Sequence, residues 1–332
     1  MSSTPQAERT NAIFVERAGG PEVLNFGDVE LLPPTTGEVR IRHTAIGVNY
    51  IDVYQRSGLY PPPRWPYVPG LEAAGVVEML GASTAELAVG DRVAYATAPT
   101  GAYSTRRNVA AALCVKIPAG VSDDVAAAAM LKGLTAHYLL RRTFRVEKGH
   151  TILIHAASGG VGTLVCQWAA RLGARVIGTV STDAKAERAR SFGCHEPIVT
   201  SRTDFVARIR ELTNGRGCDV VYDSIGKDTF DGSLESLAPR GTLVTFGQSS
   251  GVVPPFDLLR LSKTAGSVTR PSLFAYTSTR PELEAAASEL FAQLSSGDLR
   301  CPVEGRHPLR DAARAHRDLE ARKTVGSTIL VP

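Results

Sequence analysis

The sequence predicts an α/β protein made of two parts, a β-rich unit and a doubly wound parallel sheet. Three observations lead to this prediction. The chain has 332 residues, more than a single hydrophobic core usually serves. Short apolar runs separated by proline- and glycine-rich turns fill residues 11–118. From residue 151 onward, strand and helix patterns alternate.

The β-rich part carries five runs of strand composition, which read NAIFVERA, EVRIRHTAIGVN, AAGVVEML, DRVAYATA and LCVKIP. Proline is densest from Pro61 to Pro69, which excludes a regular element there and marks an exposed loop. The run SDDVAAAAMLKGLTAHYLLRRT follows and predicts a helix.

The second part opens with the continuous apolar run TILIHAA, which is typical of a buried parallel strand. GGVGTLVCQWAARLGA then predicts a helix that ends at Gly173, and RVIGTV predicts the second strand. Helices near residues 184–192, 203–213 and 229–237 alternate with the runs CDVVYDSIG and GTLVTFG. Four strand–helix units in about 120 residues suffice for a doubly wound sheet.

The tail of the chain breaks this alternation. It contains the amphipathic helix PELEAAASELFAQLSSG, the run VEGRHPL, a helix near residues 311–321 and the closing run STILVP. From these residues alone, the tail could complete either unit.

In HAASGGVG, residues 155–162, Gly159 and Gly162 occupy the second and third glycine positions of a GxGxxG loop, and Ala157 occupies the first. The second glycine lets the backbone approach a pyrophosphate, and the third lets the helix pack close to the strand. Ala157 fits the first position as long as its φ stays negative. Since the loop follows a strand and opens a helix, it predicts a dinucleotide held by N–H groups at the helix N-terminus.

The residues at the end of the second strand indicate whether NAD or NADP binds. The strand ends at Val180 without the acid that usually holds the adenosine ribose. Asp183 lies within the window for such a ribose ligand, but its position better suits the first turn of the next helix. Lys185 and Arg188 lie one turn apart on that helix. They can form a solvated helix face, or they can bind a phosphate group. We therefore expect NADP rather than NAD.

The composition excludes several classes of protein. Hydrophobic residues make up 43%, charged residues 21%, and the net charge of +4 is scattered, which argues against nucleic acid as a partner. Five dispersed cysteines without a CxxC pair predict neither a disulfide framework nor a zinc clip. The first ten residues are polar, and no apolar run reaches the ~18 residues of a membrane span. We expect a cytoplasmic protein that does not enter a membrane.

Candidate substrate-facing residues cluster in GVNYIDVYQRSGLYPPP. The hydroxyls of Tyr50, Tyr54 and Tyr60 can polarise a carbonyl and their rings can stack on a flat substrate, although the favoured interpretation of any single one is a core or rim residue. The amide of Asn49 can bind a cofactor hydroxyl or serve in a turn.

A catalytic zinc needs three protein ligands, and the pattern here argues against one. In PGLEAAGVV, Leu71 stands where a ligand histidine could stand, which leaves Glu72 without that partner. The histidines are dispersed along the chain. We expect no metal.

Ten ordered motifs from about residue 11 to residue 332 together carry a family resemblance, among them VNYIDVYQRSGLYPPP, PGLEAAGVV, LKGLTAHYLLR, HAASGGVG, VVYDSIG, FGQSSG, VTRPSL and STILVP. The chain resembles the zinc-free quinone oxidoreductases, the zeta-crystallin branch of the medium-chain dehydrogenase/reductase superfamily. The resemblance implies a GroES-like catalytic domain in residues 1–133 and 270–332, a Rossmann NADPH-binding domain in residues 134–269, and an active cleft at their junction.

The resemblance also implies which residues bind NADPH. In the GroES-like domain and the segment LKGLT they are Asn49, Tyr54, Lys132, Thr135 and Arg322. In the Rossmann domain and the segment after it they are Gly159, Gly160, Val161, Ser181, Lys185, Thr200, Ser224, Phe246, Gly247, Gln248, Ser249 and Arg270. In close relatives, lysine and arginine at the positions of Lys185 and Arg322 hold the 2′-phosphate, and a tyrosine stands where this chain has Thr200.

The implied activity is NADPH-dependent reduction of a quinone by hydride or single-electron transfer, without a metal. Asn49, Tyr54 and Tyr60 are the candidate catalytic residues. The resemblance further implies a homodimer formed near DLLRLSKTAGSVTR. Two alternatives stay open: reduction of the double bond of an enone, alkenal or enoyl thioester, and a crystallin-like or RNA-binding role with NADPH bound.

Overall fold

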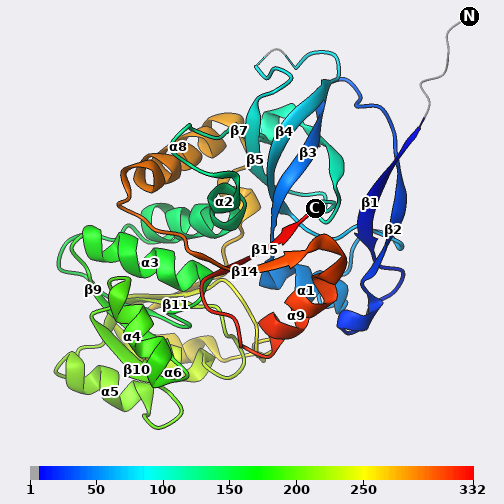
Figure 1. The fold of residues 1–332 in the computed structure, drawn as a ribbon. Coiled ribbons are helices and arrows are strands. Elements are labelled where there is room, and N and C mark those ends of the chain that lie inside the picture. Colours follow the sequence, from blue (N-terminus) through cyan, green and yellow to red (C-terminus); the bar gives the residue numbers. More distant parts are fainter. Residues whose placement is uncertain (1–6, 85) are drawn as a thin grey trace, which may run out of the picture. The chain divides into compact units, whose positions relative to one another are not determined.

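The computed structural model describes residues 7–84 and 86–332, which form two compact units (Figure 1). The first unit runs to Leu131 and resumes from Thr277 to Pro332, and the second spans Lys132–Tyr276. Helix α2 (Asp123–Tyr138) crosses from the first unit into the second. The domain limits expected above stay a prediction, because compactness alone does not show which segments fold independently.

A seven-stranded sheet forms the centre of the first unit, in the order β14-β15-β3-β4-β5-β7, with β6 paired to β3. Its strands are β3 (Glu38–Gly47), β4 (Glu72–Leu80), β5 (Arg92–Ala96), β6 (Arg106–Ala110), β7 (Val115–Lys116), β14 (Val303–Pro308) and β15 (Ser327–Val331). Strands β1 (Glu8–Phe14) and β2 (Asn25–Leu31) form a separate antiparallel pair. Helices α1 (Tyr50–Arg56), α8 (Arg280–Ser296) and α9 (Ala312–Glu320) complete the unit.

The tail of the chain belongs to this first unit. Strand β15 pairs antiparallel with β3, so that Leu330 lies opposite Ile46. Leu330 and Leu309 pack in the same buried cluster as Ile41 and Tyr95. The hydrophobic core of the unit is therefore assembled from both ends of the chain, which explains why the strand–helix alternation starts late and stops early.

The second unit is a six-stranded parallel sheet in the order β10-β9-β8-β11-β12-β13. Its strands are β8 (Thr151–Ile154), β9 (Arg175–Val180), β10 (Glu196–Val199), β11 (Cys218–Asp223), β12 (Leu237–Thr245) and β13 (Ser267–Thr269). Its further helices are α3 (Gly160–Arg171), α4 (Asp183–Ser191), α5 (Phe205–Leu212), α6 (Phe230–Glu235) and α7 (Leu273–Tyr276). This is the doubly wound strand order 3-2-1-4-5-6, which confirms the predicted fold class.

Some elements differ from the sequence-based expectation. The run LCVKIP forms only the two-residue strand β7, and the stretch around Tyr54 forms α1, a helix that was not expected. Asn49 begins this helix in an extended conformation, and the Asp52 carboxylate three residues later accepts its N–H at 2.9 Å. This reciprocal capping pattern is the local cause of the helix.

Candidate active site

The carboxyl edge of the parallel sheet brings together most of the predicted cofactor residues. Parallel strands end on the same edge, so residues that follow different strands become neighbours there. The predicted residues that follow a strand directly or open the next helix are Gly159–Val161, Ser181, Thr200, Ser224, Phe246–Ser249 and Arg270. The strand order reverses between β8 and β11, which is where doubly wound sheets bind their ligands.

The glycine loop has the geometry that the fingerprint predicts. Gly159 precedes α3 with φ −79° and ψ 175°, and none of the described side chains caps this helix, so its first N–H groups can bind an anion. A Cβ on Gly162 would lie 2.3 Å from the Ala156 carbonyl oxygen. The third glycine therefore permits the close approach of helix and strand.

The missing first glycine is compensated by another glycine. The left-handed residue of the turn is Ala156, with φ 54°, and the Ala157 side chain is buried. A Cβ on Gly178 in the neighbouring strand β9 would lie 2.5 Å from the Ala157 Cβ. Ala157 fits because Gly178 leaves room for its methyl group, a long-range contact that the loop sequence alone cannot show.

Two further loops meet at the same edge. A Cβ on Gly247 would lie 2.6 Å from the Ser224 carbonyl oxygen, and the Ser249 N–H donates to that oxygen at 3.2 Å. Arg270 donates to Thr245 Oγ1 and to the Gly247 carbonyl, each at 3.0 Å. The guanidinium thus holds the predicted cofactor loop in place.

At the end of β9, the structure places the residues expected near the adenosine ribose. The N–H and Oγ1 of Thr200 both donate to the Val180 carbonyl, at 2.9 and 3.2 Å. Thr182 caps α4 by accepting the Lys185 N–H at 3.3 Å. Ser181 and Thr200 are exposed and Lys185 is half-buried, as contacts with a ligand require.

Asp183 is the first residue of α4, in the helical position that the sequence favoured. Both of its carboxylate oxygens accept hydrogen bonds from Arg202, each at 2.5 Å. The hydrogen-bonded Arg202 guanidinium lowers the pKa of Asp183. Arg202 was not predicted from the sequence, where its position two residues after Thr200 was the only indication of a role.

Lys132 and Thr135 lie one turn apart on α2, and both are buried. Positions three apart share a face of a helix, so these two side chains point the same way. Two polar side chains on one face of a helix suit the predicted contact with a polar ligand.

In the first unit, Asn49 is held by a buried carboxylate. Its amide Nδ2 donates to Glu72 Oε2 at 2.7 Å, and the other Glu72 oxygen accepts the Leu131 N–H at 2.5 Å. Glu72 is fully buried. A Cβ on Gly47 would lie 2.1 Å from Glu72 Oε2, so only glycine fits there. Glu72 therefore fixes both Asn49 and the middle of α2.

The predicted tyrosines form one aromatic cluster on and after α1. The Tyr54 ring contacts Tyr60 edge-on, with centroids 5.2 Å apart, and Tyr50 at 5.4 Å. Tyr54 is buried, whereas Tyr60 is half-exposed. Burial raises the pKa of Tyr50, and the guanidinium of Arg322 opposes that rise. Arg322 is exposed and has φ 56°.

A buried polar chain joins α1 to α9. The Tyr103 hydroxyl donates to Asp52 and contacts His316 Nε2, each at 3.0 Å. Arg56 binds His316 Nδ1 at 3.1 Å and makes two hydrogen bonds with Glu320, at 2.9 and 2.7 Å. Burial lowers the pKa of His316 to about 3. Arg322, the predicted phosphate ligand, follows Glu320 by two residues.

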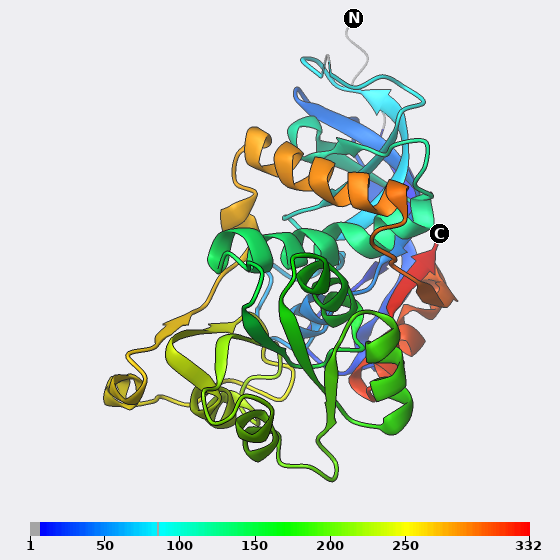
Figure 2. The ribbon, with the colours of Figure 1, turned by 90° about the vertical axis from the view of Figure 1, so that its left-hand side faces the viewer.

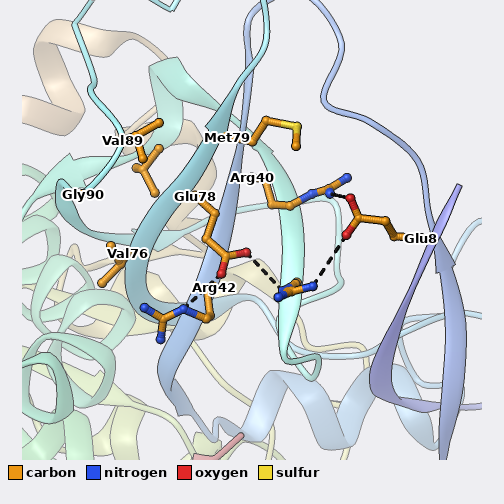
Figure 3. A pocket seen from close by; sticks show the side chains of 10 residues that line it. Glu8, Arg40, Arg42, Val76, Glu78, Met79, Val89 and Gly90 are labelled. Carbon is orange, nitrogen blue, oxygen red and sulfur yellow. Dashed lines mark hydrogen bonds and ion pairs between the residues drawn. The ribbon is translucent and has the colours of Figure 1, made fainter. Parts of the chain in front are cut away.

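A hollow of about 430 Å³ lies elsewhere on the first unit, over β3 and β4 (Figure 3). Arg106 pairs with Glu8 at 3.5 Å and with Glu78 at 3.1 Å, and these two glutamates pair in turn with Arg40 and Arg42. Among the described residues that line it, none is a predicted site residue. Each of these three arginines and two glutamates already has an ion-pair partner, so the hollow does not point to a ligand.

Within residues 7–84 and 86–332, no group of three or more His, Cys, Asp or Glu side chains is arranged to hold a metal ion. The five cysteines are buried free thiols. In the same described part of the chain, no helix combines the length and the apolar character needed to cross a membrane. The expectation of metal-free chemistry stays a prediction.

Comparison with known proteins agrees with this architecture. Residues 35–143 match the alcohol dehydrogenase GroES-like domain family, and residues 160–292 match the zinc-binding dehydrogenase family. A quinone oxidoreductase of Pseudomonas aeruginosa is 50% identical over 95% of this chain and 97% of its own length. A 2-haloacrylate reductase from Burkholderia is 45% identical over 97% of this chain and 98% of its own.

The crystal structure of Escherichia coli quinone oxidoreductase complexed with NADPH is similar with a TM-score of 0.95 and 45% identity, covering 97% of this chain and all of that one. The presence of a GroES-like unit and a doubly wound sheet in one chain, with these matches, defines a medium-chain dehydrogenase/reductase. Within that superfamily, the chain belongs to the quinone oxidoreductase family.

Proposed function

We propose that this protein is an NADPH-dependent quinone oxidoreductase that works without a metal. The observation that carries the proposal is the carboxyl edge of the parallel sheet, where residues carried over from NADPH-binding relatives gather at the switch point. The residues present fit the cofactor, because glycines at 159, 162 and 247 allow tight loops at this edge, where a Cβ would meet the backbone of Ala156 or Ser224. When bound, NADPH supplies the hydride or the electrons.

Different residues of the second unit bind different parts of NADPH. The first N–H groups of α3 hold the pyrophosphate, and Lys185 provides the cation for the 2′-phosphate. Lys132, Thr135, Ser181, Thr200, Ser224, Phe246–Ser249 and Arg270 supply the remaining cofactor contacts.

In the first unit, Asn49 orients the nicotinamide, and Glu72 fixes the amide in the rotamer that this needs. The ring of Tyr60 is half-exposed and packs edge-on against Tyr54, so a flat substrate can stack on it. Arg322 completes the set of proposed cofactor contacts.

A second activity is favoured by one observation, the near-full-length relative that is a 2-haloacrylate reductase. Both activities deliver reducing equivalents to an electron-poor conjugated acceptor. The same cofactor platform can therefore reduce an activated carbon–carbon double bond.

Steady-state assays separate these functions. Purified protein is given NADPH or NADH with a benzoquinone, an enone, a 2-haloacrylate or an enoyl thioester. We expect NADPH and the quinone to give the highest kcat/KM. Brisk double-bond reduction beside negligible quinone turnover would replace the first function by the second, and no response to either nucleotide in fluorescence titration would reject both.

We also propose a homodimer in the cytoplasm. Strand β13 is an edge of the parallel sheet, and the 3-10 helix η4 (Leu258–Lys263) precedes it (Figure 2). Leu258 and Leu259 in this helix are 71% and 74% exposed. An open sheet edge beside exposed leucines suits a second copy of the chain. Sedimentation analysis should show a dimer that Leu258→Asp with Leu259→Asp converts to a monomer.

A further inference from the structure

An ion pair occupies the corner of the second unit where a dinucleotide meets its adenosine ribose. Asp183 stands three residues after the last residue of β9 and opens α4. Arg202 makes two hydrogen bonds to it across the loop after β10. The two side chains are 70% and 60% exposed, so a bound ligand can reach both.

The backbone on both sides of this pair is fixed. Arg202 and Thr203 donate their N–H groups to the Val199 carbonyl, at 3.3 and 3.1 Å, and Thr200 is bonded to Val180. Asp183 is held by the Thr182 cap of α4. Anchored backbone segments therefore carry both the guanidinium and the carboxylate.

A carboxylate at this corner has a predictable effect on cofactor choice. In doubly wound sheets, an acid near the end of the second strand binds the ribose hydroxyl of NAD, and it repels the 2′-phosphate of NADP. Asp183 lies three residues past the end of the second strand, so its negative charge near that position disfavours the cofactor proposed here. The neighbouring charges are Lys185, Glu187 and Arg190, of which the last two pair with each other.

We propose that Arg202 determines cofactor specificity by masking the Asp183 carboxylate. This inference rests on the proposed NADPH-dependent function. The bidentate pair occupies both carboxylate oxygens, so Asp183 offers no free acceptor to a ribose hydroxyl. The paired charges cancel at short range, which leaves Lys185 as the cation that the 2′-phosphate meets.

The test measures dissociation constants of NADPH and NADH by nucleotide fluorescence and calorimetry, without turnover. Arg202→Ala exposes the carboxylate, and we expect the NADPH Kd to rise about tenfold while the NADH Kd stays within about twofold or falls. Asp183→Ala should keep or tighten NADPH binding. The double variant Asp183→Ala with Arg202→Ala should return the NADPH Kd to within about twofold of the unmodified protein.

The matched control is Arg208→Ala, which removes an exposed arginine of α5 paired with Glu211 at 2.8 Å. It should leave both dissociation constants unchanged. At about 1 M salt, where charges act over only about 3 Å, the effect of Arg202→Ala should shrink.

Two outcomes would overturn masking. Unchanged NADPH binding in Arg202→Ala would remove any role for the pair. A double variant as weak as Arg202→Ala would show that the guanidinium binds the phosphate itself. Both outcomes leave the proposed function intact. The proposed function is rejected by a different result, namely that the unmodified protein binds no NADPH.

Discussion

Glu72 is a buried carboxylate that accepts hydrogen bonds from the Asn49 amide and the Leu131 N–H. Glutamine has one acceptor oxygen, so Glu72→Gln places an NH2 group against one of these donors. A buried donor without a partner costs about 1–3 kcal/mol, and we expect urea unfolding to show a loss of that size.

Kinetic measurements distinguish a role of Glu72 in positioning Asn49 from a role in the stability of the fold alone. Because Asn49 loses its fixed rotamer, Glu72→Gln should lower kcat more than it raises the NADPH Kd. The control is Glu78→Gln on the same strand, whose partners are at the surface. Equal effects of the two substitutions on kcat would refute the positioning role of Glu72.

His43 makes folding stability depend on pH. Its Nδ1 lies 2.7 Å from the Ser104 carbonyl oxygen, and its Nε2 accepts a hydrogen bond from the Tyr95 hydroxyl at 2.8 Å. The neutral imidazole therefore satisfies both hydrogen bonds. Burial lowers the pKa of His43 from 6.5 to about 4, and the Arg107 charge adds to this. The unfolded chain takes up a proton as pH falls below 6.5, whereas the folded protein does not until about 4.

The contribution of His43 is therefore complete above its unfolded pKa and is lost as pH falls toward its folded pKa. Between about pH 7 and pH 5 the unmodified protein should lose about 2 kcal/mol more than His43→Gln, whose amide does not titrate. Urea unfolding at both pH values measures the difference. Parallel losses in the two proteins would show that His43 is not buried as described.

Residues of the glycine loop were predictable because their constraints are local. Gly159 and Gly162 follow from spacing within one turn, and the structure gives both the expected geometry. Gly178 and Arg202 were not predictable, since each acts on a residue about twenty positions away through tertiary contact. Sequence spacing reports the backbone of a loop, but not what packs against it.

Among the elements, helix α3 depends on its third glycine. In Gly162→Ala, the new Cβ would lie 2.3 Å from the Ala156 carbonyl oxygen and 2.8 Å from the Ala157 Cα. Both are backbone atoms, so the helix must shift away from β8. We expect NADPH binding to weaken at least about tenfold and stability to fall by about 1–3 kcal/mol.

Gly120→Ala is the control, because its Cβ would meet only Ser295 at 3.5 Å, an ordinary contact. Fluorescence titration and thermal unfolding compare the two variants. Normal NADPH affinity in Gly162→Ala would mean that the close approach of helix and strand does not shape the loop.

The strands and helices of the second unit were predictable because each is a continuous apolar or amphipathic run. In the first unit, the expectation missed α1, β2 and β6. The seven residues of α1 span only two turns and depend on the cap at Asn49, while RRNVA in β6 lacks apolar alternation. Short elements held by tertiary pairing carry little signal of their own.

At the scale of the molecule, the tail could not be assigned from the sequence, because its amphipathic patterns fit either unit. The structure assigns it through contacts that span most of the chain, among them the pair of Arg56 and Glu320. The Arg56 side chain is only 1% exposed. Its guanidinium makes hydrogen bonds with Glu320, with His316 and with the Gly19 carbonyl.

Glu320→Ala would leave the Arg56 guanidinium buried without its counter-charge. Losing one partner of a buried pair costs about 3–5 kcal/mol, and we expect about 3 here because Glu320 is 32% exposed. Urea unfolding measures the loss, and Glu211→Ala, from an exposed pair, should cost less than about 1 kcal/mol. Arg56→Met with Glu320→Leu should recover part of the stability, since an apolar pair buries no charge. A Glu320→Ala protein as stable as the Glu211→Ala control would show that the tail is held by its apolar contacts alone.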